Sequence, residues 1–331
     1  MDEAHAPFEG RAYSRDELAK QLGPRAATRL FTLVDAAHKR VRVVEEREVQ
    51  GAAEWAAANR RRGRGPVIDS RVDGKTLITD ASLSDRPGAG PAPLFGPAEA
   101  GKGGEVLEAC FMRGKDVVTR WKGLAGAGLG LAASLGMSPG ALEFRAEGLE
   151  HAGGSSVVRM EVVTPGLNRF LIGIDDTDTP KGGATWALAR DAASAIEDMA
   201  VLRQRVVQLF PGVPEKTTNC VASLIEAAVA PWMEEAVKIE LRDRVESLSK
   251  SPEVGLAHVK GLLIHNYHEA ESFCEKARGG IVTREQADAA ARAVGAEVPL
   301  DGRGAIGAIA ALGCAQMGPE AADVAQARAP R

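Results

Sequence analysis

Apolar residues at helical spacing mark the beginning of the chain. Leucines and a valine recur every three or four residues between 14 and 37, and Ser14 with Glu17 forms a capping-box pattern. Pro24 interrupts this stretch, so the pattern predicts two helices rather than one. The β-branched run Val41–Val44 predicts a strand instead. The first part of the chain is therefore expected to mix helices with strands.

The rest of the chain alternates in the same way. Short apolar or alternating runs predict strands over residues 106–112, 142–147, 156–164 and 169–174, with a turn at 165–166. Periodic runs predict helices over residues 52–62, 116–137, 184–202, 219–229, 235–246, 283–294 and 305–312. The run Arg169–Ile174 is almost continuously apolar, which is typical of a strand buried on both faces. The pattern predicts an α/β or α+β fold, with a mixed sheet, flanking helices and two sub-domains.

Composition suggests where these sub-domains divide. At roughly 150 residues per domain, the 331 residues predict about two domains. The Pro- and Gly-rich run between Leu83 and Gly104 predicts a long loop, either mobile or acting as a lid. We expect an N-terminal α+β region ending in that loop (1–104), a connecting α+β segment (105–167), a domain over 168–316 and a flexible tail (317–331).

Charge and cysteine content exclude several classes of protein. The chain has 41 basic and 45 acidic residues, and its 14 aromatics (8 Phe, 4 Trp, 2 Tyr) are few. Neither a basic field nor a broad stacking surface for nucleic acid is therefore expected. The four cysteines contain no CxxC pair, which excludes a zinc ribbon and predicts isolated thiols in a reducing compartment. No apolar leader or spanning segment is evident, and we expect a cytoplasmic protein without a membrane contact.

The strongest chemical signal follows the buried run. Asp175, Asp176 and Asp178 come directly after Ile174. Three carboxylates this close repel one another unless a cation compensates, and magnesium prefers carboxylate and phosphate oxygens. A position beyond the carboxyl end of a strand also suits a ligand in an open sheet. The pattern predicts a magnesium site at the three aspartates; the alternative is an acidic, solvated turn.

The same loop and two later segments carry groups that suit phosphate. Glycines let the backbone approach a ligand closely, and a helix N-terminus attracts anions. Lysine adds positive charge, and arginine can form a bidentate pair with phosphate. The predicted nucleotide-binding residues are Thr177, Lys181, Gly182, Gly183, Lys216, Thr217, Asn219, Gly302, Arg303 and Gly304, with Thr185 in the first turn of the next helix. Taken singly, the two later segments are equally consistent with a helix cap and a Gly-Arg-Gly turn.

Two clusters are weaker leads. His258, His265 and His268, with Cys274 and Glu271 nearby, could contribute to a zinc site, although a surface cluster is the better interpretation. The run 60–64 is rich in arginine and is most simply a solvated helix end. If it is functional, it binds an anionic substrate or an RNA backbone.

The motif IGIDDTDTPKGGATWAL resembles the opening of the kinase-like domain of the archaeal tRNA agmatinylcytidine synthetase. It is more similar still to the methanogenesis marker protein 11 family, which shares that domain. The likeness continues through FPGVPEKTTNCVASL (210–224), SPEVGLA (251–257) and GRGAIGAIAAL (302–312), and so covers roughly residues 168–316. Most of its specificity comes from the combination of the DDTD and GRGAIGAIAA segments.

The resemblance implies a kinase-like, ATP-binding domain that uses ATP and Mg²⁺. In the tRNA enzyme, ATP activates a cytosine oxygen by phosphorylation, and agmatine then displaces the phosphate. Asp175, Asp176 and Asp178 match the acids of that motif, and Thr185 matches a threonine associated with phosphorylation. The chain departs from the family in lacking zinc-ribbon cysteines and further RNA-binding modules, while residues 1–165 precede the motif. The resemblance therefore supports ATP-dependent phosphate chemistry for this chain more strongly than it supports a tRNA substrate.

We therefore expect an ATP- and Mg²⁺-dependent phosphoryl-transfer enzyme, a transferase or ligase. It would activate an acceptor oxygen, with an amine as a candidate second substrate. Asp175, Asp176, Asp178 and Thr185 are its predicted catalytic residues. Its expected partners are ATP and an unidentified acceptor, a small molecule rather than RNA, with a homodimer left open. The alternatives are an RNA-modifying enzyme of the agmatinylcytidine synthetase type and a non-catalytic nucleotide-binding assembly factor.

Overall fold

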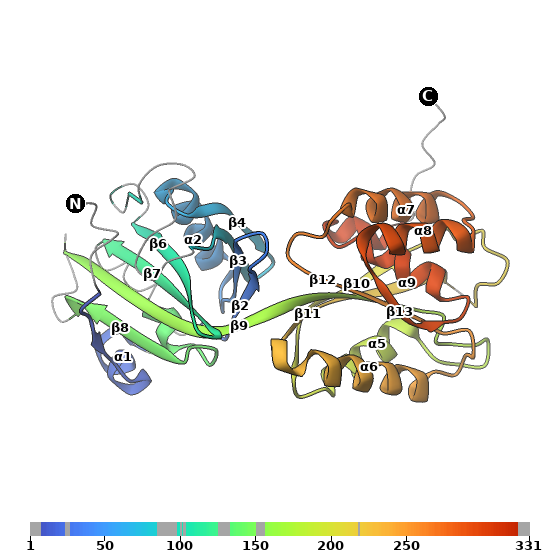
Figure 1. The fold of residues 1–331 in the computed structure, drawn as a ribbon, viewed down its shortest axis with the longest axis horizontal. Coiled ribbons are helices and arrows are strands. Elements are labelled where there is room, and N and C mark those ends of the chain that lie inside the picture. Colours follow the sequence, from blue (N-terminus) through green and yellow to red (C-terminus); the bar gives the residue numbers. More distant parts are fainter. Residues whose placement is uncertain are drawn as a thin grey trace, which may run out of the picture. The chain divides into compact units, whose positions relative to one another are not determined.

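The computed structural model describes residues 8–23, 27–84, 98–99, 101, 104–124, 133–149, 156–217 and 219–323. The chain forms two compact units, Met1–Leu167 and Asn168–Arg331. One 19-residue strand, β9 (Val157–Asp175), contributes to both of them (Figure 1). Each unit therefore builds its own sheet around a different part of the same strand.

Strands dominate the first unit. Its elements are β1 (Arg11–Ala12), α1 (Arg15–Leu22), β2 (Arg29–Asp35), β3 (Arg40–Glu46), α2 (Gln50–Gly63), β4 (Val67–Asp73), β5 (Thr76–Ser82), β6 (Glu105–Arg113), β7 (Asp116–Leu124) and β8 (Glu143–Glu147). One antiparallel group has the order β1-β8-β9-β7-β6, and a second runs β2-β3-β5-β4. The short parallel pairing of β2 with β9 at residues 166–167 joins the two groups.

A buried ionic network ties α2 to the sheets of this unit. Arg60 is fully buried, as are Glu45 and Glu105 on either side of it. The Arg60 guanidinium contacts both carboxylates, donates to the Thr79 hydroxyl at 3.0 Å and lies 4.5 Å from the centre of the Trp121 ring. Arg60, the first arginine of the run 60–64, thus belongs to the core, which corrects its interpretation as part of a solvated or RNA-binding helix end.

The strands of the second unit, besides its part of β9, are β10 (Met199–Gln208), β11 (Val221–Val229), β12 (Gly255–Lys260) and β13 (Glu297–Asp301). Its helices are α5 (Thr185–Ser194), η3 (Pro231–Met233), α6 (Glu234–Leu248), α7 (Tyr267–Gly279), α8 (Arg284–Val294), α9 (Ala305–Leu312) and η4 (Pro319–Ala322). These elements form three layers around an antiparallel sheet. Its strand order is β10-β11-β9-β12-β13. Alternation along β9 sends Phe170, Ile172 and Ile174 to the face covered by α5 and α6, and Leu171 to the face covered by α7, α8 and α9 (Figure 1). The prediction that residues 169–174 form a strand buried on both faces is confirmed. Together the units give a mixed α/β protein, as predicted.

The prediction of a helix over residues 283–294 is confirmed by α8. The Thr283 hydroxyl caps this helix, and Gln286 completes a capping box.

Several predicted elements are wrong. The second helix predicted within 14–37 is strand β2, and the helix predicted over 116–137 begins as strand β7. The turn predicted at 165–166 lies within β9, and the helix predicted over 184–202 ends at Ser194. The alanine-rich run over 219–229 is β11, in the interior of the sheet. Burial on both faces of a sheet overrides local helix propensity in these runs. Most of the loop predicted between Leu83 and Gly104 lies outside the described residues.

The cysteines correct a second expectation. Cys274 of α7 and Cys314 after α9 form a disulfide, with Cα atoms 6.3 Å apart, so they are not isolated thiols. Cys110 and Cys220 are free, as predicted. In the described part of the chain, no helix is both long and apolar enough to cross a membrane.

Candidate functional site

Five loops of the second unit meet at one edge of its sheet. Strand β9 ends there at Asp175, which pairs with Gly255 at the start of β12. Gly255 pairs in turn with Asp301, the last residue of β13. On the other side, Val221 at the start of β11 pairs with Gln208 at the end of β10. The sequence predicts a ligand beyond the carboxyl end of a strand in an open sheet. In this antiparallel sheet, strand ends and strand starts alternate along the edge instead.

Glycines let helix α9 approach this edge very closely. A Cβ atom at Gly255 would overlap the backbone where α9 begins, and a Cβ atom at Gly307 would overlap the Asp175 carboxylate. Only a residue without a side chain fits either position without displacing its neighbour. The GRGAIGAIAAL segment is therefore shaped to bring the first turn of α9 against Asp175.

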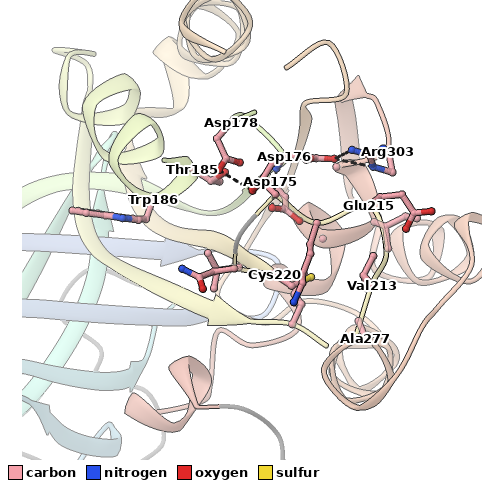
Figure 2. Close-up of a pocket in the computed structure, with 18 of the residues that line it drawn as sticks. Asp175, Asp176, Asp178, Thr185, Trp186, Val213, Glu215, Cys220, Ala277 and Arg303 are labelled. Atoms are coloured by element: carbon pink, nitrogen blue, oxygen red, sulfur yellow. Dashed lines mark hydrogen bonds and ion pairs between the residues drawn. The ribbon is translucent and has the colours of Figure 1, made fainter. Parts of the chain in front are cut away.

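A cavity of about 380 Å³ opens at this edge (Figure 2). This volume lies near the lower end of the range for small-molecule pockets. Of the residues predicted from the sequence, ten line it: Asp175, Asp176, Asp178, Gly183, Thr185, Lys216, Thr217, Asn219, Arg303 and Gly304. Loops that are far apart in the chain thus come together as one wall.

The carboxyl groups of the first two aspartates are poorly compensated by positive charge. Burial raises the pKa of the Asp175 carboxyl well above its usual value, and the neighbouring Asp176 and Asp178 raise it further. The Oδ1 atom of Asp175 accepts the N–H of Asp176 at 2.8 Å, and among the described residues no cation forms an ion pair with Asp175. Burial also raises the pKa of Asp176, although Arg303 partly offsets that effect. Such a pair of carboxyls favours a cationic ligand.

Arg303 is the basic group in direct contact with this acidic cluster. Its Nε and Nη2 atoms donate to Oδ2 of Asp176 at 3.0 and 2.8 Å, the contact drawn in Figure 2. The Arg303 side chain stays 43% exposed, whereas that of Asp176 is 16% exposed. The Asp176 backbone adopts φ 57°, in the left-handed region, which turns the chain sharply after β9. The guanidinium therefore sits at the mouth of the cavity, between Asp176 and solvent.

Hydroxyl groups order the rest of the acidic loop. Thr217 donates to Oδ2 of Asp178 at 2.9 Å, which links the loop before β11 to the DDTD motif. The buried Thr177 hydroxyl donates to Oγ1 of Thr185 at 3.1 Å. Thr185 is the first residue of α5 and is itself buried. Its hydroxyl is therefore held beside the aspartates at the start of a helix.

Four predicted residues do not line the cavity. Thr177 and Gly182 support the loop from outside the cavity wall, and Gly302 packs against the backbone of Glu253. Lys181 lies exposed at the tip of a tight turn closed by hydrogen bonds between Thr179 and Gly182. The sequence places Lys181 in the motif, but the structure leaves it outside the cavity wall.

Sequence reasoning missed three features of the site. Lys250 lies over the Gly182–Gly183 segment, and its backbone N–H donates to the Thr177 carbonyl at 2.9 Å. Trp186, next to Thr185, lines the cavity, and so does an apolar wall from Ala277 and the 280–282 segment between α7 and α8. The signal for Lys250 was its place just before SPEVGLA. The apolar wall has no comparable signal, because nothing in residues 277–282 distinguishes them from core.

The described side chains do not form a closed metal site. They contain no group of three or more His, Cys, Asp or Glu residues arranged to hold a metal ion. The three aspartates by themselves therefore do not make up a metal site, and the magnesium site stays a prediction. Mg²⁺ usually takes phosphate oxygens and waters as further ligands. His265 and His268 are exposed and Cys274 is in a disulfide, so these residues do not support the zinc alternative.

Comparison with known proteins identifies the class of domain. Residues 171–231 match the family described as the TiaS TCKD domain. The crystal structure of TiaS in complex with tRNA and ATP is similar with a TM-score of 0.41 and 24% identity, over 45% of this chain and 37% of that one. The complex of TiaS with tRNA, AMPCPP and agmatine gives 0.39 and 23% over the same shares. The chain thus spans little more than a third of the length of these structures.

The comparison with sequences identifies the family. An uncharacterized protein of Methanocaldococcus jannaschii, MJ0921, is 30% identical over 297 residues, which are 87% of this chain and 93% of the archaeal protein. The chain belongs to the family of that protein. The match of residues 171–231 to the TiaS TCKD domain confirms the predicted resemblance to the kinase-like domain of the tRNA agmatidine synthetase. The link to methanogenesis marker protein 11 stays a prediction.

Proposed function

We propose that this protein is an ATP-using enzyme of the RNA-modifying type, whose second unit binds ATP with Mg²⁺ and activates an acceptor oxygen. The observation that carries the proposal is the half-buried, poorly compensated pair Asp175 and Asp176 on the wall of a cavity. The match of residues 171–231 to the TiaS TCKD domain supports ATP as the ligand and RNA as the class of acceptor.

The residues present fit a magnesium-bound triphosphate. Gly307 lets the Asp175 carboxylate pack directly against the first turn of α9 at the cavity wall, and Asp175 has no cation partner among the described residues. In this proposal Asp175, Asp176 and Asp178 hold Mg²⁺, which would supply positive charge to the phosphates. Lys216 and Arg303, which line the same cavity, would bind phosphate oxygens.

The chain's own groups would then position the phosphates and the acceptor, without supplying a strong nucleophile. Arg303 exchanges Asp176 for a phosphate oxygen as the ligand enters, and so neutralises charge that develops during phosphoryl transfer. Thr185 and the first turn of α5 direct a hydroxyl and backbone N–H groups at the same region. Phosphoryl transfer depends mainly on positioning and charge, so the site needs no separate strong nucleophile. Whether Thr185 itself accepts a phosphoryl group is tested by mass measurement after incubation with Mg²⁺ and ATP.

Calorimetric titration with ATP, with and without Mg²⁺, tests the proposal. Wild type is expected to bind ATP in a Mg²⁺-dependent manner, and Asp176→Asn to lose that component, since asparagine tolerates the left-handed backbone but removes the charge. Asp198→Asn is the matched control, because Asp198 is an exposed acid in the turn before β10. If Asp176→Asn bound Mg²⁺ and ATP as tightly as wild type, the site assignment would be wrong.

The acceptor class requires a separate experiment. Filter binding of total tRNA over a range of salt concentrations is expected to show affinity that falls as salt rises. A small-molecule acceptor is the second candidate, because Arg60 of the basic run 60–64 is buried and unable to reach RNA. ATP binding without any tRNA binding would favour that second candidate. ATP binding without release of ADP, AMP, phosphate or pyrophosphate in the presence of tRNA would favour a non-catalytic role.

A further inference from the structure

The cavity has two apolar surfaces on opposite sides of the acidic cluster. One is the wall formed by Ala277 and residues 280–282, extended by Leu209 and Ile306. The other is Trp186 in the first turn of α5. In Figure 2, Trp186 lies on one side of the three aspartates, and Ala277 and Arg303 lie on the other. A ligand whose phosphates are held at the aspartates through Mg²⁺ therefore has a separate apolar surface on each side.

Trp186 has the properties of a stacking surface. It is the only aromatic residue among the described residues that line the cavity, and it remains 46% exposed. The Arg190 guanidinium lies 5.5 Å from its ring centre, in cation–π range. The backbone is also fixed, since Gln204 donates its amide N–H to the Trp186 carbonyl at 2.7 Å. An indole held in place beside a cation is suited to stack on a base whose backbone carries phosphate.

The two surfaces differ in a way that assigns their ligands. Leu209 and Ala277 form the buried inner part of the first wall, while Ile281 at its edge is 67% exposed, so the inner part suits the base of a nucleotide that is enclosed in the cavity. A cavity of about 380 Å³ has little room for a second ligand of that size. An acceptor must therefore approach at the exposed side, where Trp186 lies next to Thr185. We propose that Trp186 stacks on the acceptor base of an RNA and positions it at the phosphate end of the cavity, an inference that rests on the function proposed above.

Paired binding measurements on the full chain test this role. Total tRNA is titrated by filter binding onto protein saturated with Mg²⁺ and ATP, and ATP affinity is measured separately by calorimetry. Because stacking contributes about 1–3 kcal/mol per base, Trp186→Ala is expected to weaken tRNA binding by roughly 5- to 150-fold. Trp186→Phe is expected to restore most of this loss, and the affinity for ATP is expected to stay within about twofold in both variants. Trp232→Ala, which alters another exposed tryptophan outside the cavity wall, is the control and is expected to change neither affinity.

Fluorescence gives a readout that general damage to the fold would not imitate. A stacked base is expected to quench Trp186, so tRNA should quench wild type more than Trp186→Phe, and Trp232→Phe should be quenched like wild type. If Trp186→Ala bound tRNA as tightly as wild type, or lost ATP binding instead, the inference would be overturned. If wild type bound ATP but no tRNA, this inference would fail while the ATP site stood. If wild type bound no ATP, the proposed function itself would fail.

Discussion

Each unit contains a cluster of acidic side chains in a protected position, and the cluster of the first unit has more cationic partners. Glu45 and Glu105 lie in the core against Arg60, and Glu45 also contacts Arg47. The arginines outweigh burial at Glu45 and lower its pKa, whereas burial prevails at Glu105 and raises the pKa there. In the second unit, burial raises the pKa of both Asp175 and Asp176, and Arg303 at the cavity mouth is the cation in contact with the cluster.

The contrast separates a structural role from a functional one. A buried charge that meets its partners inside the fold specifies packing, while a charge left poorly compensated beside a cavity destabilises the fold until a ligand arrives. Such a feature is expected where binding, rather than stability, determines the residue. Substitutions in the two clusters should therefore change different properties of the protein.

The largest effect is expected from Arg60→Ala in the first unit. The variant leaves Glu45 and Glu105 buried without their main partner, and removing one member of a buried ionic network destabilises a fold by about 3–5 kcal/mol. Urea denaturation followed by circular dichroism measures the loss. Arg62→Ala, on the exposed side of the same helix, should change the free energy of unfolding by no more than about 0.5 kcal/mol. A similar small loss for Arg60→Ala would show that the network is not part of what holds this unit together.

Gly307→Ala should disrupt the second cluster by steric overlap. The added methyl group would overlap the Asp175 carboxylate, so either that carboxylate or helix α9 must move. We expect a loss of Mg²⁺-dependent ATP binding and a destabilisation of about 1–3 kcal/mol, typical of overpacking. Gly279→Ala is the matched control, since no atom lies near the position of its Cβ. Calorimetry and denaturation on both variants provide the comparison, and normal ATP binding by Gly307→Ala would contradict the close approach of α9.

Arg303→Ala should affect ligand binding more than stability. The Arg303–Asp176 pair is substantially exposed on the arginine side, so its removal should change the free energy of unfolding by less than about 1 kcal/mol. The affinity for ATP should fall by about tenfold, because a charged hydrogen bond to phosphate contributes roughly 1.5–3 kcal/mol before the lost Asp176 contact is deducted. Arg303→Lys tests the geometry, because lysine keeps the charge but not the bidentate contact. Tighter ATP binding by Arg303→Ala would instead identify the arginine as a competitor of the ligand.

The smallest effect is expected at the two lysines near the glycine turn. Lys250 lies over the Gly182–Gly183 segment, whereas Lys181 projects at the exposed tip of the turn. Lys250→Ala should therefore weaken ATP binding by a few-fold, and Lys181→Ala by less. Their ATP affinities at two salt concentrations provide the test, because exposed charges act more weakly as salt rises. If Lys181→Ala weakened ATP binding more than Lys250→Ala did, Lys181 would be the lysine that acts on the phosphates.

The sequence allowed the local parts of this site to be predicted, but not the way in which distant parts combine. The run Arg169–Ile174 identified a strand buried on both faces, and the acids after it line the cavity. The sequence pattern could not show that β11 is a strand, because its alanines favour a helix. Only its position between β10 and β9 in the sheet makes it a strand. Arg60 looked exposed for a similar reason, since its partners Glu45 and Glu105 come from strands on both sides of it in the sequence. The apolar wall near Ala277 depends on tertiary contacts alone.

The most direct test of the contrast between the two acidic clusters is the free energy of unfolding of Asp175→Asn, measured with and without Mg²⁺ and ATP. Asparagine preserves the oxygen that accepts the Asp176 N–H but removes the buried charge. We predict that the ligand-free variant is more stable than wild type by about 1 kcal/mol, and that Mg²⁺ with ATP stabilises wild type but not the variant. A variant that is less stable than wild type and still gains stability from Mg²⁺ with ATP would contradict this account.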